Sequence, residues 1–575
     1  MTLAAGSNRD PPRFLAQREP GVRADAAASR CKRTTTGVVT GGSTVTCVNN
    51  RSEWSRRQFL RYAAALGVAT PLGLAACASD DAAVVATDPT AVPASTSPPV
   101  TAIPDPTAAA VPDPTATAVP ELTTVAETGS QFDPSMGYWQ QGGYRPVTDE
   151  LDETSLVVRG SIPSSLDGLY VRNGSNGIGD TAHWFFGEGM VHGVEIGGGK
   201  ALSYRNRYVR TPVYEAATGG PAASAVPGGV NSQSNVSVVS HGGRLLSLGE
   251  IGWPFELDPS DLSTLGPVNF DGALGLNLTA HPKVDPATGL MHAFGYGLLA
   301  APFLTYYIIS ADGQQIVHST PINVTAASMI HDFAITSSDV VFWEGPVLFD
   351  INMAISGEPI PYRWDDGYGA RLGVMPLGGT GDQIRWIQVE PMFIFHGTNA
   401  YRDGDNVVIH ASKLPDFFRQ YDGLDGPSLL TKWTINTAGA ALTIREDQLH
   451  DLPLDLPSYD RRFLTDPLKD AYYLSTQQTD DGNVWFEGIT GYNFASGSLD
   501  RWISGPDLQP NEALFVADSE SAGEGEGWLL SYAWDRTVDR SELVILDATD
   551  LASGPVASIE LPQRVPFGFH AAFHR

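Results

Sequence analysis

Short apolar runs separated by turn residues dominate the chain from about residue 131 to its C-terminus. Residues 304–310 (Leu-Thr-Tyr-Tyr-Ile-Ile-Ser) and 314–318 (Gln-Gln-Ile-Val-His) flank the tripeptide Ala-Asp-Gly. Aromatic and β-branched residues on both sides of a glycine turn predict a β-hairpin. Long helical periodicity is scarce in this region, so we expect strands rather than helices.

The same pattern recurs along the rest of this region. Further strand-like runs occupy residues 243–248, 340–343, 406–409, 483–486, 528–533 and 543–546. No regular alternation of strands with helices and no glycine-rich phosphate loop stands out, which disfavours an α/β sheet. The pattern predicts a large all-β domain over residues 130–575, either a propeller, a sandwich or a barrel.

Upstream of this region the hydrophobic pattern disappears. Residues 78–129 are rich in Pro, Thr, Ala and Asp, and the triplet Asp-Pro-Thr recurs at residues 88–90, 105–107 and 113–115. Such a segment cannot bury a core, and its prolines lack backbone donors. We expect an extended, disordered tether between the N-terminal leader and the β domain.

The leader, residues 1–77, contains features of an export signal. Residues 55–61 (Ser-Arg-Arg-Gln-Phe-Leu-Arg) match a twin-arginine pattern, and an uncharged stretch follows over residues 62–79. Its mild hydrophobicity favours a signal peptide over a spanning helix. Residues 74–77 (Leu-Ala-Ala-Cys) match a bacterial lipobox, in which Cys77 would be lipidated. These features predict export by the twin-arginine route and an extracytoplasmic lipoprotein anchored to a membrane. An uncleaved signal anchor and a chance Arg-Arg pair in a cytoplasmic protein are the alternatives.

Charge and cysteine usage exclude several classes of protein. The net charge is −29, although residues 1–77 carry eleven basic against four acidic residues, so the body is strongly acidic. An acidic body repels phosphate backbones, which excludes nucleic-acid partners. Cys31, Cys47 and Cys77 all lie in the leader, so the β domain has neither disulfides nor thiolate metal ligands.

Three motifs give the chain a specific resemblance. They are residues 168–176 (Gly-Leu-Tyr-Val-Arg-Asn-Gly-Ser-Asn), 183–192 (His-Trp-Phe-Phe-Gly-Glu-Gly-Met-Val-His) and 204–211 (Tyr-Arg-Asn-Arg-Tyr-Val-Arg-Thr). With these motifs the chain resembles the carotenoid cleavage oxygenase family, from about Gly142 to the C-terminus. The resemblance implies a seven-bladed β-propeller with a cap of loops and short helices over the active-site face. Ser175, Phe186 and Glu188 depart from the family pattern, in segments that we interpret as turns and packing elements.

Four of the twelve histidines have contexts that match the iron ligands of this family. They are His281 (Thr-Ala-His-Pro), His331 (Met-Ile-His-Asp-Phe), His396 (Phe-His-Gly-Thr-Asn) and His570 (Phe-Gly-Phe-His). Their separations of 50, 65 and 174 residues are close to one, one and three propeller blades. The resemblance implies one Fe(2+) per subunit, held by four imidazoles that leave coordination positions open for O2 and substrate.

The family also orients three of its four histidines with glutamates, which accept the second imidazole N–H. The matching positions in this chain are Glu250, Asp455 and Glu512. Asp455 is shorter than the expected glutamate. Either the backbone comes closer to the histidine at this position, or a water molecule bridges the gap.

The remaining histidines and the aromatic residues have simpler interpretations. We interpret eight histidines as hydrogen-bonded packing residues: His183, His192, His241, His292, His318, His410, His450 and His574. Trp343, Phe393, Phe395 and Phe567 are expected to belong to the core first and to a substrate tunnel second.

The resemblance implies a non-haem Fe(II) dioxygenase that cleaves a C=C double bond of a carotenoid or apocarotenoid with O2 and yields two carbonyl products. The expected partners are a hydrophobic small molecule and O2. A stilbene-cleaving dioxygenase is the second possibility; that branch grips its phenolate with a Tyr/Lys pair, and residues 203–220 contain no lysine. A non-catalytic surface propeller that binds a pigment or glycan is the third, and the four histidine contexts argue against it.

Overall fold

The computed structural model describes residues 136–575, apart from residues 180–182, 222–227, 357, 359, 420–425 and 479–483. The leader, Cys77 and the tether lie outside the described residues. No helix in the described part of the chain is long and apolar enough to cross a membrane.

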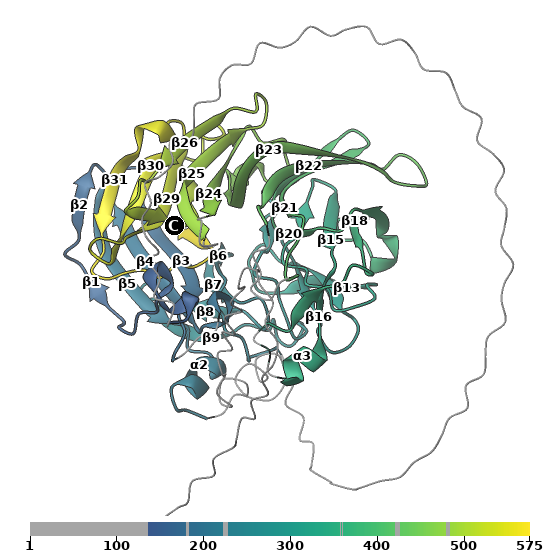
Figure 1. Cartoon of the computed structure of the whole chain (residues 1–575), viewed down its shortest axis with the longest axis horizontal. Helices are drawn as coiled ribbons and strands as arrows, with labels where there is room; N and C mark the ends of the chain where they lie inside the picture. The colour runs from purple at the N-terminus through teal and green to yellow at the C-terminus, as the bar shows by residue number, and fades with distance from the viewer. Residues whose placement is uncertain are drawn as a thin grey trace, which may run out of the picture. The chain divides into compact units, whose positions relative to one another are not determined.

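The described residues form seven antiparallel blades arranged around a common centre (Figure 1). Blade one comprises, in spatial order, β1 (Asp152–Glu153), β5 (Lys200–Tyr208), β4 (Gly189–Gly197), β3 (Gly168–Ser175) and β32 (Ala571–His574). Blade two comprises β6 (Ser237–His241), β7 (Arg244–Leu248), β8 (Phe255–Leu257) and β9 (Thr264–Pro267). Blade three comprises β10 (Lys283–Val284), β11 (Met291–Tyr296), β12 (Leu304–Ile309) and β13 (Ile316–Ile322).

Blades five and six share one long strand, β23 (Thr443–Ser458), which ends one blade and begins the next. Blade four comprises β14 (Ala334–Ile335), β15 (Asp339–Glu344), β18 (Ala370–Pro376) and β19 (Arg385–Val389). Blade five consists of β20 (Phe393–Asp403), β21 (Asn406–Leu414), β22 (Leu429–Asn436) and β23. Blade six continues from β23 through β24 (Asp470–Gln478), β25 (Val484–Asn493) and β26 (Leu499–Ile503). In blade seven, β27 (Leu508–Pro510) and β28 (Leu514–Ala517) both pair with β29 (Gly527–Asp535), followed by β30 (Arg540–Asp547), β31 (Pro555–Glu560) and β2 (Val157–Gly160).

Short elements connect the blades. A separate hairpin consists of β16 (Val347–Phe349) and β17 (Tyr362–Trp364). The α-helices among the described residues are α2 (Pro212–Ala217) and α3 (Ile351–Ser356). The 3-10 helices are η1 (Tyr138–Gln140), η2 (Gly142–Tyr144), η3 (Trp184–Phe186), η4 (Gly381–Gln383), η5 (Arg461–Phe463) and η6 (Leu551–Ser553).

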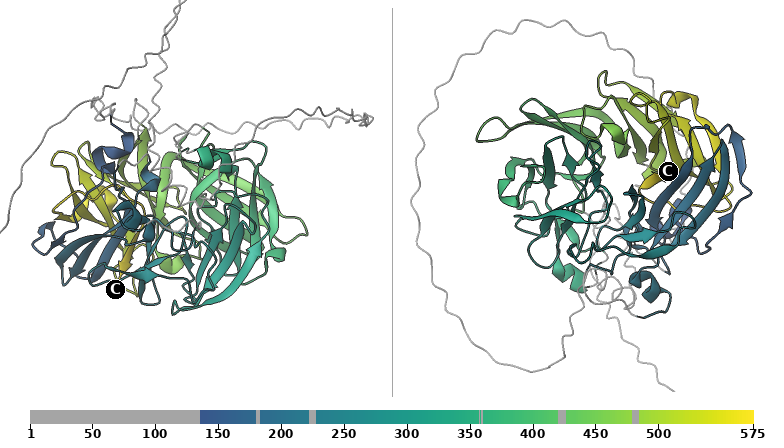
Figure 2. Two further views of the ribbon diagram at one scale, coloured as in Figure 1. Left: turned by 90° about the horizontal axis from the view of Figure 1, so that it is seen from below. Right: turned by 180° about the vertical axis from the view of Figure 1, so that it is seen from behind.

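The beginning of the described chain pairs with its end. β3 pairs with β32 in blade one, and β2 pairs with β31 in blade seven. The early blue strands and the late yellow strands accordingly lie side by side in Figures 1 and 2. The architecture is the predicted seven-bladed β-propeller, so the sandwich and the barrel are wrong.

The predicted strands are confirmed where the apolar pattern was strong. The hairpin forms between β12 and β13, and Gly313 in its turn has a φ of 68°. The other six runs fall in β7, β15, β21, β25, β29 and β30. In β22, Trp433 and Ile435 are buried, while Lys432 before them and Thr434 between them are less so, the alternation of a strand with one buried face.

Strands at the inner ends of the blades contact one another across the boundaries between blades. β14 contacts β20 of the next blade, and β32 contacts β6 on one side and β28 on the other. Side chains from several blades can therefore meet near these strands, although their residues are far apart in the sequence.

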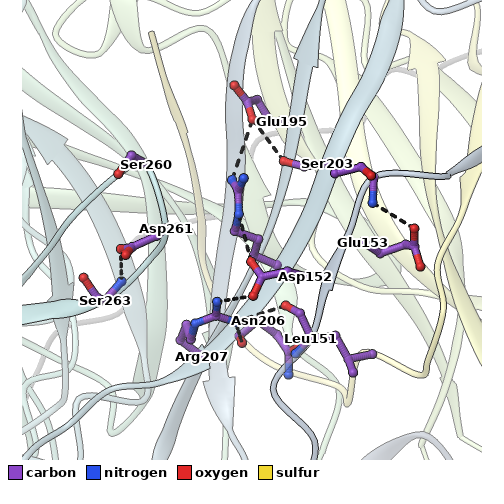
Figure 3. A network of polar contacts seen from close by, with 12 residues as sticks. Leu151, Asp152, Glu153, Glu195, Ser203, Asn206, Arg207, Ser260, Asp261 and Ser263 are labelled. Atoms are coloured by element: carbon purple, nitrogen blue, oxygen red, sulfur yellow. Dashed lines mark hydrogen bonds and ion pairs between the residues drawn. The ribbon is translucent and has the colours of Figure 1, made fainter. Parts of the chain in front are cut away.

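The outer edge of blade one is held by polar contacts instead. Asp152 on β1 forms ion pairs with Arg205 and Arg207 on β5, and the Leu151 N–H donates to Asn206 Oδ1 over 2.8 Å (Figure 3). Ser203 Oγ donates to Glu195 Oε2 over 3.0 Å on the same face. The contacts of Asp152 and Leu151 fasten a two-residue edge strand to the blade.

Candidate metal centre and substrate cavity

The structure brings together the four histidines singled out in the sequence. His281 and His331 lie just before β10 and β14, His396 lies in β20, and His570 directly precedes β32. One ring nitrogen from each lies within 4.8 Å of those of the others. The Nε2 atoms of His281 and His331 are 2.9 Å apart. Residues from four blades thus present their imidazoles to one point.

An irregular backbone aims His396 at this point. The pairing of β20 with β21 shifts register between Ile394 and Gly397, and again between Gly397 and Asn399. A β-bulge bends a strand locally and redirects its side chains. His396 lies in this irregular part of β20, whereas residues 399–403 of the same strand pair regularly with β21.

Each of the three predicted carboxylates lies against a different histidine. His396 Nδ1 is 2.7 Å from Asp455 Oδ1, and His570 Nδ1 is 2.8 Å from Glu512 Oε1. His331 Nδ1 lies 2.8 Å from Glu250 Oε2, which is an ion-pair distance, although the contact lacks the alignment of a hydrogen bond. Carboxylates placed on Nδ1 fix the ring orientation and leave Nε2 for a ligand.

Asp455 contacts His396 directly, so no bridging water molecule is needed. Of the two alternatives for this short side chain, the one in which the backbone comes closer to the histidine therefore applies. The pairing of β23 with β24 shifts register between Asp455 and Ser458. Leu456, the next residue, has a φ of 52°, in the left-handed region that a leucine rarely adopts. The direct contact of Asp455 with His396 thus coincides with an irregular stretch of backbone.

The carboxylates have further partners that the sequence did not reveal. Tyr296 Oη donates to Glu250 Oε1 over 2.5 Å, and Ser428 Oγ donates to Asp455 Oδ2 over 2.9 Å. The Ala571 N–H donates to Glu512 Oε2 over 3.0 Å. No motif marked Tyr296 or Ser428, because their contacts depend on how neighbouring blades pack.

Burial controls the protonation of the site. It lowers the pKa of His281 and of His570 well below the usual value, and the neighbouring histidines lower both further. Burial also acts to lower the pKa of His331, but Glu250 outweighs it and the pKa lies above the ordinary value. Burial raises the pKa of Glu512 to about 7. Neutral imidazoles, which His281 and His570 provide, are the form that binds metals.

The four histidines fit a metal ion. His396 Nε2 is buried and has no hydrogen-bond partner among the described residues. A buried nitrogen without a partner is costly, and a cation at the point where the four rings meet would satisfy it. Imidazole suits first-row transition metals, and the donor set contains no thiolate.

A cavity of about 360 Å³ opens onto the histidines. His331, His396 and His570 line it, together with Glu250 and Asp455. The other walls are mostly apolar. Six phenylalanines contribute to them: Phe185, Phe186, Phe395, Phe418, Phe486 and Phe569.

The aromatic predictions were right in part. Phe395 lines the cavity as well as belonging to the core, whereas Trp343, Phe393 and Phe567 are core residues and do not line the cavity. Phe186 was interpreted as part of a packing element, and it is also a wall of the cavity.

The eight histidines assigned to packing each have a hydrogen-bond partner outside the four-histidine group. His192 Nδ1 is 2.9 Å from Tyr204 Oη, and His292 Nδ1 is 2.6 Å from Tyr306 Oη. The other six are His183, His241, His318, His410, His450 and His574. All eight are therefore hydrogen-bonded within the protein, as the sequence interpretation expects.

Comparisons with known proteins agree with this geometry. The sequence model of the retinal pigment epithelial membrane protein family, to which the carotenoid cleavage oxygenases belong, matches residues 144–575. The chain belongs to this family. A carotenoid cleavage oxygenase of Mycobacterium tuberculosis (strain CDC 1551 / Oshkosh) is 34% identical over 77% of the chain and 98% of the relative.

Solved structures of the family show the same fold. The lignostilbene dioxygenase of Pseudomonas brassicacearum superimposes with a TM-score of 0.69 and 28% identity, over 76% of this chain and 99% of that one. The cobalt-substituted apocarotenoid oxygenase of Synechocystis gives a TM-score of 0.66 and 25% identity, over 75% of this chain and 97% of that one. The chain is an oxidoreductase of this family that incorporates O2 and cleaves a C=C double bond. The non-catalytic propeller is therefore wrong.

Proposed function

We propose that the protein binds one Fe(2+) through His281, His331, His396 and His570, and that it cleaves a C=C bond of a carotenoid or apocarotenoid into two carbonyl products. The single observation that carries the proposal is that a four-histidine cluster, three of whose members contact carboxylates, faces a cavity with mainly apolar walls. Iron, when bound, would supply the redox and Lewis-acid chemistry that reaction with O2 requires.

The side chains of the protein have three tasks in this reaction. Glu250, Asp455 and Glu512 orient the imidazoles that hold the metal. The aromatic walls bind a long apolar substrate by removing it from water, which contributes roughly 25 cal/mol per Å² of apolar area. The same walls exclude water from the site and hold the double bond beside the metal, which lowers the entropic cost of reaction. In this account no side chain acts as a nucleophile or general base, and no nicotinamide or flavin is needed.

A product assay tests the proposal. Purified, iron-loaded protein is incubated with a series of apocarotenoids, in air and under strict anaerobiosis, and the products are separated and identified by mass. We expect paired aldehyde or ketone fragments in air alone. Iron-replete protein that leaves every polyene intact, or cleavage that proceeds equally without O2, would overturn the proposal.

A stilbene is the second candidate substrate, because a lignostilbene dioxygenase is among the proteins of similar structure. The walls of the cavity argue for the first candidate, since the described residues that line it include neither lysine nor arginine to pair with a phenolate. Parallel incubation with resveratrol-like stilbenes decides between the two: faster cleavage of the stilbenes would reverse the ranking.

We also propose that the chain is exported by the twin-arginine route and anchored by a lipid on Cys77, at the start of the tether. This route carries folded proteins, so the metal could be loaded before export. Replacing Arg56 and Arg57 with lysine should leave a precursor in the cytoplasm, and Cys77→Ala should abolish lipid labelling. Wild-type protein found intact and unlipidated in the cytoplasmic fraction would contradict both parts.

A further inference from the structure

A buried ion pair lies directly beside the histidine segments. Lys283 follows His281 by two residues, and Asp332 is the residue after His331. Lys283 Nζ is 2.7 Å from Asp332 Oδ1, and the two side chains are 12% and 1% exposed. The pair therefore connects the segment that enters blade three with the one that enters blade four.

The same carboxylate reaches a third histidine segment through its other oxygen. The N–H of Gly397, the residue after His396, donates to Asp332 Oδ2 over 2.8 Å. The N–H of Phe333 donates to Oδ1 over 2.8 Å and fixes the direction of the carboxylate. One side chain is thus bonded to the neighbours of His281 and His396, and it is itself the neighbour of His331.

The residue at position 397 is a glycine, which lies between the Trp343 ring and the Asp332 carboxylate. A Cβ atom on Gly397 would lie 2.7 Å from the Trp343 ring and 3.5 Å from Asp332 Oδ2. A larger residue would therefore clash with the buried Trp343 ring, whereas its distance to Asp332 Oδ2 would be an ordinary van der Waals contact. A glycine at this position lets the His396 segment pack against Trp343 while its N–H donates to Asp332.

Stability alone gives a weak reason for such a pair. Replacing a buried ion pair by apolar residues is often neutral or stabilising, whereas in some proteins a buried polar or ionic group fixes one arrangement of neighbouring segments. We propose that the Lys283–Asp332 pair positions His281, His331 and His396 relative to one another, and so sets the affinity and coordination geometry of the bound metal. This inference rests on the proposed function, because it requires that the four histidines bind a metal.

Substitution of Asp332 tests the inference with a metal readout. Asp332→Asn keeps the size of the side chain and one carbonyl oxygen but removes the charge that faces Lys283. Co(II) is the probe, because its visible absorption reports on ligand geometry and a member of the family binds it. We expect the variant to bind Co(II) about tenfold more weakly, at the lower end of the range for outer partners of metal ligands, with a displaced absorption spectrum.

Asp339→Asn is the matched control. Asp339 is also buried, at 5% exposure, and its oxygens accept from Arg402 over 2.6 and 2.7 Å. It adjoins none of the four histidines in sequence. We expect this variant to lose thermal stability but to keep the Co(II) affinity and spectrum of the wild type.

The outcomes separate this inference from the proposed function. Wild-type protein that binds neither cobalt nor iron overturns both. Wild-type protein that binds Co(II), together with an Asp332→Asn variant of the same affinity and spectrum, overturns the positioning role alone. If Asp332→Asn fails to fold, Lys283→Gln removes the other end of the pair; a tenfold loss of affinity supports the role, and unchanged affinity and spectrum overturn it.

Discussion

Carboxylates pair with basic side chains at the centre of the propeller and at the outer edge of blade one, but the two regions differ in burial. At the centre, His396 and Asp455 are 10% and 21% exposed, and Asp455 also accepts from Ser428 Oγ. At the edge, the ion pair between Arg207 and Asp152 is drawn in Figure 3. These side chains are 21% and 54% exposed. The edge pair faces solvent, where water and salt screen its attraction.

This difference in burial indicates different roles for the carboxylates of the two regions. An exposed ion pair contributes at most about 1 kcal/mol to stability, so the edge contacts only fasten a short strand. The central carboxylates orient rings that meet at one point, so their loss should appear in metal binding before it appears in stability. This contrast can be tested from the largest expected effect to the smallest.

Loss of a histidine should have the largest effect. His396→Ala removes a ring whose buried Nε2 lacks a partner among the described residues, so the variant should fold yet lose bound iron and all measurable cleavage. Metal analysis and a product assay on the same sample check this. His410→Ala, which removes a buried histidine outside the group, should retain iron. Stoichiometric iron in His396→Ala would remove that residue from the site.

Loss of a carboxylate should have a smaller effect. Glu512→Gln preserves the shape of the side chain but weakens its contact with His570, so metal affinity or activity should fall by about 10–100-fold. Titration of metal-free protein with Fe(2+) under anaerobic conditions measures this. An unchanged affinity would assign Glu512 to packing alone.

Loss of a hydroxyl that contacts one of the three carboxylates should lower metal affinity still less. Tyr296→Phe deletes the hydroxyl that donates to Glu250, and we expect metal affinity to fall by less than about tenfold, because the carboxylate itself remains. Tyr306→Phe is the control, since that hydroxyl contacts His292, which is not one of the four histidines. Equal losses in both variants would show a general packing effect.

Loss of the ion pairs at the outer edge of blade one should have the smallest effect. Asp152→Asn should lower the free energy of unfolding by no more than about 1 kcal/mol and leave iron content and turnover unchanged. Chemical denaturation and metal analysis test the two statements separately. A change in iron content would contradict the separation between edge and centre.

Some strands and some residues of the site could be predicted from the sequence, and others could not. Strongly apolar runs such as residues 528–533 predicted their strands, and motifs around His281, His331, His396 and His570 predicted which side chains meet. Apolar periodicity did not predict β10 and β14, because each has only two residues. It also missed β23, whose polar sequence spans two blades. The contacts of Tyr296 and of Asp332 depend on bulges and blade packing, which no local pattern encodes.

Reconstitution with iron tests whether cleavage depends on one iron bound by the four histidines. Metal-free protein is titrated with Fe(2+) under anaerobic conditions, and bound iron and the rate of apocarotenoid cleavage in air are measured on each sample. We expect both to rise together and to reach their plateau at one iron per chain. Full activity in metal-free protein, or an activity that bears no relation to bound iron, would contradict it.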